Sequence, residues 1–192
     1  MNPIPHSVGR FACLDFVNSR RTDHLGRNGV VDRLPSPEWQ HWFLHRWGLA
    51  PVAGEPPLPL LAEARDTLRR VLEDWAAGRR QAVRDLGRLD AWLAAAPVRR
   101  RFDGGLEPVR RDWTWVLAEV VASAGQVVAA GDGRRLKVCA NPACSWLFWD
   151  ESRNLAGRWC DSATCGNLVK VRAFRRRRRD ACAGRGSSRL RD

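Results

Sequence analysis

Four of the chain's six cysteines lie close together in residues 139–165, which read CANPACSWLFWDESRNLAGRWCDSATC. Cys139, Cys144, Cys160 and Cys165 follow the spacing C-x4-C-x15-C-x4-C. Two close pairs of cysteines are typical of a thiolate cage around one tetrahedral metal ion, most often structural Zn²⁺. Four sulfur ligands leave no open coordination position. We therefore predict a zinc ion that stabilises the fold and takes no part in catalysis.

Six cysteines could instead form three disulfides in a secreted protein. Two observations argue against this alternative. The first ten residues lack the charged start and apolar run of a signal peptide, and four of the cysteines fall into two close pairs. We therefore expect reduced, zinc-bound cysteines in a cytoplasmic protein, with Cys13 and Cys182 as bystanders. No segment approaches about 18 consecutive apolar residues, so we expect no membrane span.

The residues around the cysteines predict a hairpin followed by a helix. Asn141-Pro142 forms a turn between the first two cysteines, and residues 146–149 form an apolar, strand-like run. A polar turn then leads back to Cys160, and Cys165 stands at the start of a terminal helix. The backbone amides at the start of a helix stabilise a thiolate and so favour metal binding.

The terminal helix carries most of the excess positive charge. Residues 139–192 contain 12 Lys or Arg against 5 Asp or Glu, which is +7 of the total formal charge of +12. We expect Leu168, Val171 and Phe174 to pack on the finger and the basic side chains to face solvent, where they can contact phosphates. A solubilising tail and an RNA-binding segment are the alternatives. The candidate nucleic-acid contacts are Arg153, Arg158, Lys170, Arg172, Arg175, Arg176, Arg177, Arg178 and Arg179.

The first part of the chain has the pattern of a helical domain. Apolar residues at helical spacing predict helices within residues 36–48, 61–78, 82–97 and 113–131. Residues 98–109 predict a small β-hairpin that turns at Asp103-Gly104-Gly105. Residues 9–19 fit a buried strand or a short helix equally well, and residues 20–34 have the composition of a loop. The predicted fold is therefore mainly α with a small β-hairpin element.

Four polar residues in this first part are candidates for ligand binding. Asp15 and Asn18 interrupt an apolar run, so they could form the floor of a ligand pocket or, as we favour, hydrogen-bond to local backbone. His41 and His45 are four residues apart on one predicted helix and could hold a metal, although ordinary surface histidines are the favoured interpretation. We find no phosphate-binding loop, nucleophile elbow or acid–histidine pair, so we expect no enzyme activity.

Residues 137–179 resemble the CGNR zinc finger of bacterial transcription regulators. The resemblance rests on the four cysteines, on Arg158-Trp159 before the second pair, and on Cys165-Gly166-Asn167 followed by Lys170-Val171-Arg172. The family motif ends in Arg, whereas this chain has Leu168. The segment Cys13-Leu14-Asp15-Phe16-Val17-Asn18 more loosely resembles the ABATE domain that commonly precedes this finger.

The resemblance implies a stress-related DNA-binding regulator whose first domain senses a small molecule. We expect an ABATE-like helical regulatory domain over residues 1–136, a zinc finger with a basic helix over 137–180 and a disordered tail over 181–192. The predicted function is a zinc-dependent DNA-binding transcription regulator at the nucleoid, controlled through a ligand or through formation of a homodimer. The alternative is a zinc-stapled adaptor that binds RNA or an acidic protein.

Overall fold

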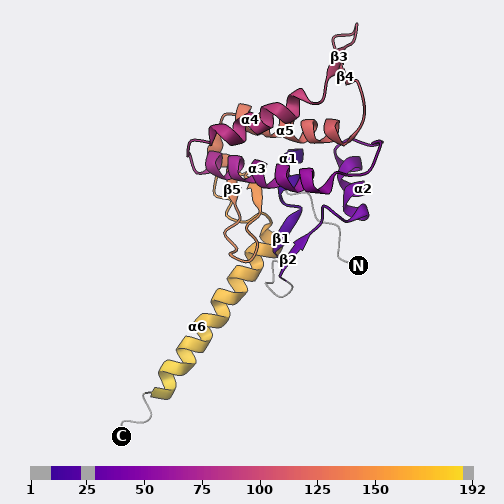
Figure 1. Ribbon diagram of the computed structural model, residues 1–192. Helices are drawn as coiled ribbons and strands as arrows, with labels where there is room; N and C mark the ends of the chain where they lie inside the picture. The colour runs from indigo at the N-terminus through magenta and orange to yellow at the C-terminus, as the bar shows by residue number, and fades with distance from the viewer. Residues whose placement is uncertain (1–9, 23–28, 188–192) are drawn as a thin grey trace.

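The computed structural model describes residues 10–22 and 29–187. Its described part is mainly helical with small antiparallel hairpins, as predicted, and its strands form three two-stranded sheets. A helical body occupies one end of the molecule, and a single long helix projects from the other (Figure 1). The helices are α1 (Ala12–Val17), α2 (Pro37–Arg46), α3 (Leu58–Ala76), α4 (Val83–Ala94), α5 (Trp113–Ala129) and α6 (Asn167–Ser187), with short turns η1 (Gly133–Arg135) and η2 (Ser162–Gly166). The strands are β1 (Arg20–Thr22), β2 (Val30–Asp32), β3 (Val98–Arg100), β4 (Leu106–Pro108), β5 (Leu136–Val138) and β6 (Leu147–Trp149).

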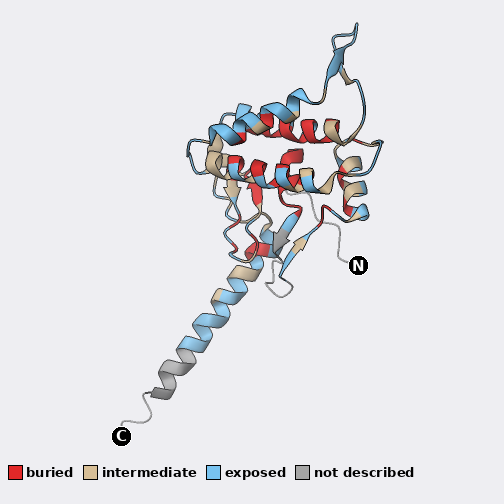
Figure 2. Ribbon diagram, in the orientation of Figure 1, coloured by how far each residue is buried: buried red, intermediate tan, exposed pale blue. Residues whose placement is uncertain are grey.

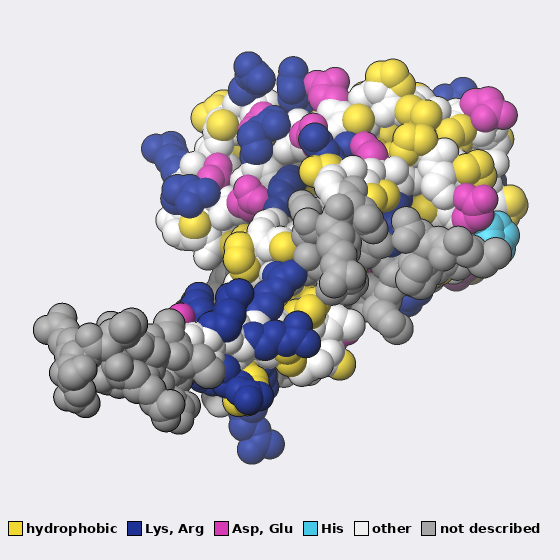
Figure 3. Space-filling model, turned by 90° about the horizontal axis from the view of Figure 1, so that it is seen from below, with side chains coloured by type: hydrophobic (Ala, Val, Ile, Leu, Met, Phe, Trp, Pro, Cys, Tyr) yellow, Lys and Arg dark blue, Asp and Glu magenta, His cyan; other side chains and the backbone are white. Residues whose placement is uncertain are grey.

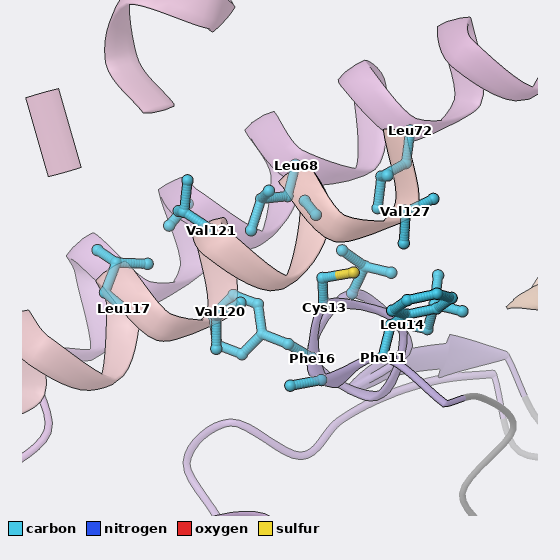
Figure 4. Packing of buried hydrophobic residues seen from close by; sticks show 14 of the residues in the cluster. Phe11, Cys13, Leu14, Phe16, Leu68, Leu72, Leu117, Val120, Val121 and Val127 are labelled. Atoms are coloured by element: carbon cyan, nitrogen blue, oxygen red, sulfur yellow. The ribbon is translucent and has the colours of Figure 1, made fainter. Parts of the chain in front are cut away.

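Helix α1 lies at the centre of the helical body. All six of its residues are buried, because α3 and α5 pack against it. Figure 4 shows Cys13 and Phe16 of α1 among side chains of α3 and α5 such as Leu68 and Val120. The apolar run that fitted a strand or a helix is therefore a helix, and it is covered on every side. Burial also raises the pKa of Cys13 to about 12, which makes this thiol unreactive at neutral pH.

The four longer helices of the body form where the apolar spacing predicted them. The buried residues of α3 recur at intervals of three and four, which places them on one face of the helix. Ser36 caps α2 by accepting a hydrogen bond from the backbone N–H of Trp39 (3.3 Å), and Asp112 caps α5 in the same way. The helices α2 and α3 end shortly before Gly48 and Gly78. The φ angles of these glycines, 67° and 65°, lie in the left-handed region that favours glycine. These local signals account for the positions of the helices.

The loop predicted over residues 20–34 is wrong in part, because β1 and β2 form an antiparallel hairpin there. Arg20 pairs with Asp32 in the ladder, and residues 23–28 lie outside the described residues. The hairpin is held by Arg65, a buried residue of α3 whose guanidinium binds both carboxylate oxygens of Asp32 at 2.6 and 2.9 Å. A tertiary ion pair therefore stabilises strands whose own sequence has no alternating apolar pattern. The hairpin predicted over residues 98–109 is confirmed as β3 and β4.

Strand β6 connects the helical body to the cysteine-rich segment. It forms the predicted hairpin of the finger, but its partner is β5, which precedes the first cysteine, and not the segment that leads back to Cys160. All three residues of β6 are buried. Leu147 and Trp149 belong to the core of the helical body, whereas Phe148 packs among the cysteines. Because neighbouring side chains of a strand point to opposite faces, one short strand contributes to both clusters. The main core thus includes residues beyond residue 136. The boundary between the helical domain and the finger at residue 136 stays a prediction.

We expect replacement of Leu147 by Ala to destabilise the whole protein. Leu147 is fully buried, so the loss of its side chain should lower the free energy of unfolding by about 2–5 kcal/mol. The measurement is denaturant unfolding of the zinc-loaded protein, followed by tryptophan fluorescence. The control is Leu106→Ala in the exposed strand β4, which should change stability by less than about 0.5 kcal/mol. Equal effects of the two changes would contradict the shared core.

Candidate metal centre and basic helix

The four sulfur atoms of the predicted cage converge on one point. All of them lie within 4.8 Å of one another, with 3.6 Å between the Sγ atoms of Cys144 and Cys160 and 3.8 Å between those of Cys160 and Cys165. Zinc–sulfur bonds of about 2.3 Å in a tetrahedron place neighbouring sulfurs about 3.8 Å apart. A disulfide would bring two sulfurs to about 2.05 Å, and the four cysteines are free. The cysteine quartet therefore fits Zn²⁺ and rules out the disulfide alternative for these residues.

The first two cysteines are positioned by a turn around Asn141. This side chain is fully buried, and its Oδ1 accepts a hydrogen bond from the backbone N–H of Ala143 at 3.2 Å. The carbonyl of Asn141 accepts a second bond from the N–H of Cys144 at 2.8 Å. Its amide Nδ2 also donates to the sulfur of Cys165 at 3.4 Å. Asn141 thus closes the first turn and links it to the second cysteine pair.

The second cysteine pair depends on a close approach at Gly166. Asp161 caps the turn η2 by accepting hydrogen bonds from two backbone amides, and Cys165 lies in that turn. A Cβ atom at Gly166 would lie 2.9 Å from Cδ1 of Trp159, which is closer than side chains tolerate. The glycine after Cys165 is therefore required by packing. The guanidinium of Arg158 lies over the ring of Trp159, 5.2 Å from its centroid.

The four thiols share negative charge unevenly. Hydrogen bonds from the other three sulfurs hold the pKa of Cys139 far below its usual value, whereas contact with Cys139 raises the pKa of Cys144 and Cys160. Around Cys165, contact with Cys139 raises the pKa, but the other two sulfurs outweigh it and lower the pKa to about 7. A divalent cation that binds all four sulfurs removes the repulsion that keeps protons on them. The quartet is thus a site whose full deprotonation requires a metal.

Asp150 and Lys137 organise the loop between the two cysteine pairs. Lys137 donates from its Nζ to Oδ2 of Asp150 at 2.6 Å and to the carbonyls of Leu155 and Gly157. Burial raises the pKa of Asp150, but the hydrogen bond from Lys137 and those from the loop outweigh it and hold the pKa well below its ordinary value. Sequence reasoning treated Asp150 only as part of a polar turn. The pairing of Lys137 with the strand residue Phe148 places its side chain near this aspartate, which a pattern of spacings does not reveal.

Asp15 and Asn18, the two candidate ligand-binding residues, both have partners within the protein. The indole N–H of Trp47 donates to Oδ2 of Asp15 at 3.1 Å. Asn18 binds the backbone of Leu147 twice, since its Nδ2 donates to the carbonyl (2.8 Å) and its Oδ1 accepts from the N–H (3.0 Å). The side chain of Asn18 therefore continues the ladder of β6 rather than binding local backbone, and it ties α1 to the finger.

Helix α6 projects from the finger, and only its beginning is packed. The side chains of Leu168 and Val169 are half-buried, whereas Val171 is 36% and Phe174 is 53% exposed. The expectation that Val171 and Phe174 pack on the finger is wrong, because the helix has left the small finger by its second turn (Figure 2). The helix also continues to Ser187, so the first seven residues of the expected disordered tail are helical in the described backbone. Residues 188–192 lie outside the described residues.

The predicted DNA-contacting side chains are all exposed. Figure 3 shows Lys and Arg side chains gathered over the finger and along α6. Residues 167–180 contain seven Lys or Arg and one acidic residue, Asp180. The guanidinium of Arg178 lies 5.9 Å from the ring centroid of Phe174. The exposed residues are Arg153, Arg158, Lys170, Arg172, Arg175, Arg176, Arg177, Arg178 and Arg179.

We expect Cys160→Ser to abolish stoichiometric zinc binding. The change removes one of four ligands from a closed site, and the remaining three cannot complete its tetrahedron. Metal analysis of the purified protein should give about one zinc per chain before the change and much less after it. Cys13→Ala is the control, because Cys13 is buried in the helical body and outside the quartet. Unchanged zinc content in Cys160→Ser would refute the site.

We expect Asp150→Asn to lower the stability of the zinc-loaded protein by about 1.5–3 kcal/mol at neutral pH, because it removes the charge that Lys137 binds. A carboxyl with a lowered pKa stabilises the fold above its ordinary pKa of about 3.9, and this contribution disappears as the pH falls through the lower folded value. The difference from the unchanged protein should therefore be constant between about pH 8 and pH 5.5 in denaturant unfolding. The exposed Asp90→Asn is the control. A difference that varies across this range would contradict the assignment.

Comparison with known families agrees with this architecture. Residues 135–178 match the model of the CGNR zinc finger, which contains the quartet and the start of α6. Residues 11–131 match the ABATE model, described as "Putative stress-induced transcription regulator", which covers α1 to α5. No curated protein matches the chain. Every helix within the described residues is too short or too polar to cross a membrane. The chain belongs to the ABATE family of putative stress-induced transcription regulators and carries a CGNR zinc finger.

Proposed function

We propose that the protein is a zinc-dependent transcription regulator that binds duplex DNA through α6. The observation that carries this proposal is a projecting helix with seven basic residues and one acidic residue in positions 167–180, fixed at its beginning by the cysteine quartet. Such a surface attracts phosphates, and binding releases their counterions. The zinc supplies the fold of the finger and so sets the direction of the helix.

The dimensions of α6 suit the major groove of B-DNA. Its 21 residues correspond to a rod of about 31 Å. An α-helix fits into a major groove about 12 Å wide. The run Arg175–Arg179 passes around the whole circumference of the helix. In this arrangement one side of the run enters the groove, and the other side binds the phosphates that border it.

Arg153 and Arg158 would supply further phosphate contacts. Both are exposed, and they lie in the loop of the finger between the two cysteine pairs. Arg158 already lies over Trp159, so its side chain is partly ordered before binding. We propose that these two residues fix the register of the finger on the DNA backbone, while α6 supplies most of the affinity.

The helical body would supply control in response to stress, through a small molecule or through homodimer formation, in a bacterial cytoplasm at the nucleoid. Asp15 and Asn18 support a transmitting role in this scheme. Asp15 receives a hydrogen bond from Trp47, directly after α2, and Asn18 pairs with the backbone of β6. A change in the body that moved α1 would therefore reach the finger directly. A ligand would bind elsewhere on the body unless it displaced these partners.

An adaptor that binds RNA is the second candidate. The exposed ring of Phe174 favours it, because aromatic side chains beside arginines stack on unpaired bases. The same side chain can contact a thymine methyl group in a major groove. The two functions therefore differ in their preferred nucleic acid rather than in the surface that they use.

We expect the triple change of Arg175, Arg176 and Arg179 to Gln to weaken binding to duplex DNA. Each lost phosphate contact lowers the slope of log affinity against log salt by about 0.9, so three lost contacts lower it by about 2.7. Fluorescence anisotropy at several salt concentrations measures this slope. The matched control replaces Arg80, Arg84 and Arg100 by Gln. These residues are exposed and lie outside the finger, and their replacement removes the same amount of charge.

Two outcomes would overturn the proposed function. Equal losses in the two triple variants would show that overall charge, not α6, determines binding. Equal affinity of the unchanged protein for duplex DNA, structured RNA and heparin would indicate a general polyanion binder. Preference for structured RNA would favour the adaptor. Genome-wide mapping of bound DNA then tests the regulatory role without assuming a ligand.

A further inference from the structure

Two histidines face each other on the surface of α2, far in the fold from the cysteine quartet. His41 and His45 are one helical turn apart, and both side chains are exposed. Their ring centroids are 4.2 Å apart, and the ring planes make an angle of 49°. Figure 3 shows histidine side-chain atoms, in cyan, at the edge of the molecule, away from the Lys and Arg side chains around α6.

Open hollows lie on both sides of the pair. The larger has a volume of about 750 Å³ and is lined by Glu38, Trp42 and Arg46 as well as by the two histidines. The smaller, of about 390 Å³, is lined mainly by apolar residues and backbone between Leu44 and Val52, again with both histidines. Both imidazole rings therefore border open space that a small ligand and its water molecules can occupy.

We propose that His41 and His45 bind one divalent transition-metal ion of the class that prefers imidazole, such as Zn²⁺, Ni²⁺ or Cu²⁺. Imidazole nitrogens are ordinary ligands for these ions, and side chains four residues apart on a helix are neighbours on its surface. Glu38 borders the same hollow, but its carboxylate does not gather with the two imidazoles within 4.8 Å, so the two histidines are the protein ligands. Water completes the coordination in the open hollow. This inference goes beyond the proposed DNA-binding function and does not depend on it.

The scaffold of the pair is rigid, which favours binding. Helix α2 is capped at its start by Ser36, and Trp39 and Phe43 on its inner face are buried. Directly after the helix, Trp47 is hydrogen-bonded to Asp15 of α1. Glu38, in the first turn, accepts a hydrogen bond from Ser36 through Oε2 at 2.6 Å. Ligands held on a well-packed helix lose little freedom when the ion binds.

The site differs in kind from the cysteine quartet. Among residues 10–22 and 29–187, the quartet is the one group of three or more potential ligands whose atoms all lie within 4.8 Å of one another. The pair on α2 offers two imidazoles at an open surface, and two neutral ligands hold a divalent ion less tightly than four thiolates. We therefore infer that the histidine pair binds an exchangeable metal ion, in addition to the more tightly bound ion of the quartet.

The test uses untagged protein in which metal analysis has confirmed one zinc in the quartet. Isothermal titration with ZnCl₂ should reveal a second, weaker equivalent, and NMR should show that it shifts the imidazole signals of His41 and His45. His41→Ala and His45→Ala should each abolish this equivalent and leave the first zinc in place. His24→Ala is the matched control and should retain both. Both changed positions in α2 are exposed, and circular dichroism checks that the variants remain folded.

A second equivalent that is absent from the unchanged protein would overturn the proposal, as would one that persists in both α2 variants. Loss of the second equivalent in His24→Ala would also contradict the assignment to α2. Because the quartet keeps its zinc in each variant, DNA binding can be measured separately on the same proteins.

Discussion

The whole arrangement depends on a strand of three residues whose two faces serve different cores. Leu147 and Trp149 of β6 pack into the helical body, where Phe11 meets the ring of Trp149 edge-on at 5.2 Å. Phe148, on the opposite face, packs on the cysteine quartet. Asn18 then pairs with the backbone of the same strand through two hydrogen bonds. The finger consequently shares buried residues with the body and is not joined to it by a linker alone.

This attachment determines what the basic helix can do. The quartet fixes the first turn of α6, and β6 fixes the quartet to the body, so the direction of α6 follows from packing in two cores. Beyond its first turn the helix contacts little of the protein, and its arginine side chains up to Arg179 are exposed to solvent. The cost of exposing Val171 and Phe174 is offset if these side chains meet a partner, which nucleic-acid bases can provide.

The features that were predictable from the sequence are those with local causes. Cysteine spacing gives the metal site, and caps and apolar spacing give α2 to α5. The hairpin of β1 and β2 was missed because Arg65 and Asp32, which hold it, are 33 residues apart. The role of Asn18 was missed because its partner is 129 residues away. Periodicity also placed Phe174 on an apolar face of α6, but it carries no information on whether a neighbour covers that face.

The shared strand also bears on how such proteins diversify. A finger that is self-contained can be shuffled between genes, because excision exposes little apolar surface at the cut. Here a break between residues 131 and 135 would remove Leu136, Leu147 and Trp149 from the core of the helical body. Both fragments would then expose apolar surface that is buried in the intact chain. Separation of the two halves would therefore destabilise both, because β6 contributes side chains to both clusters.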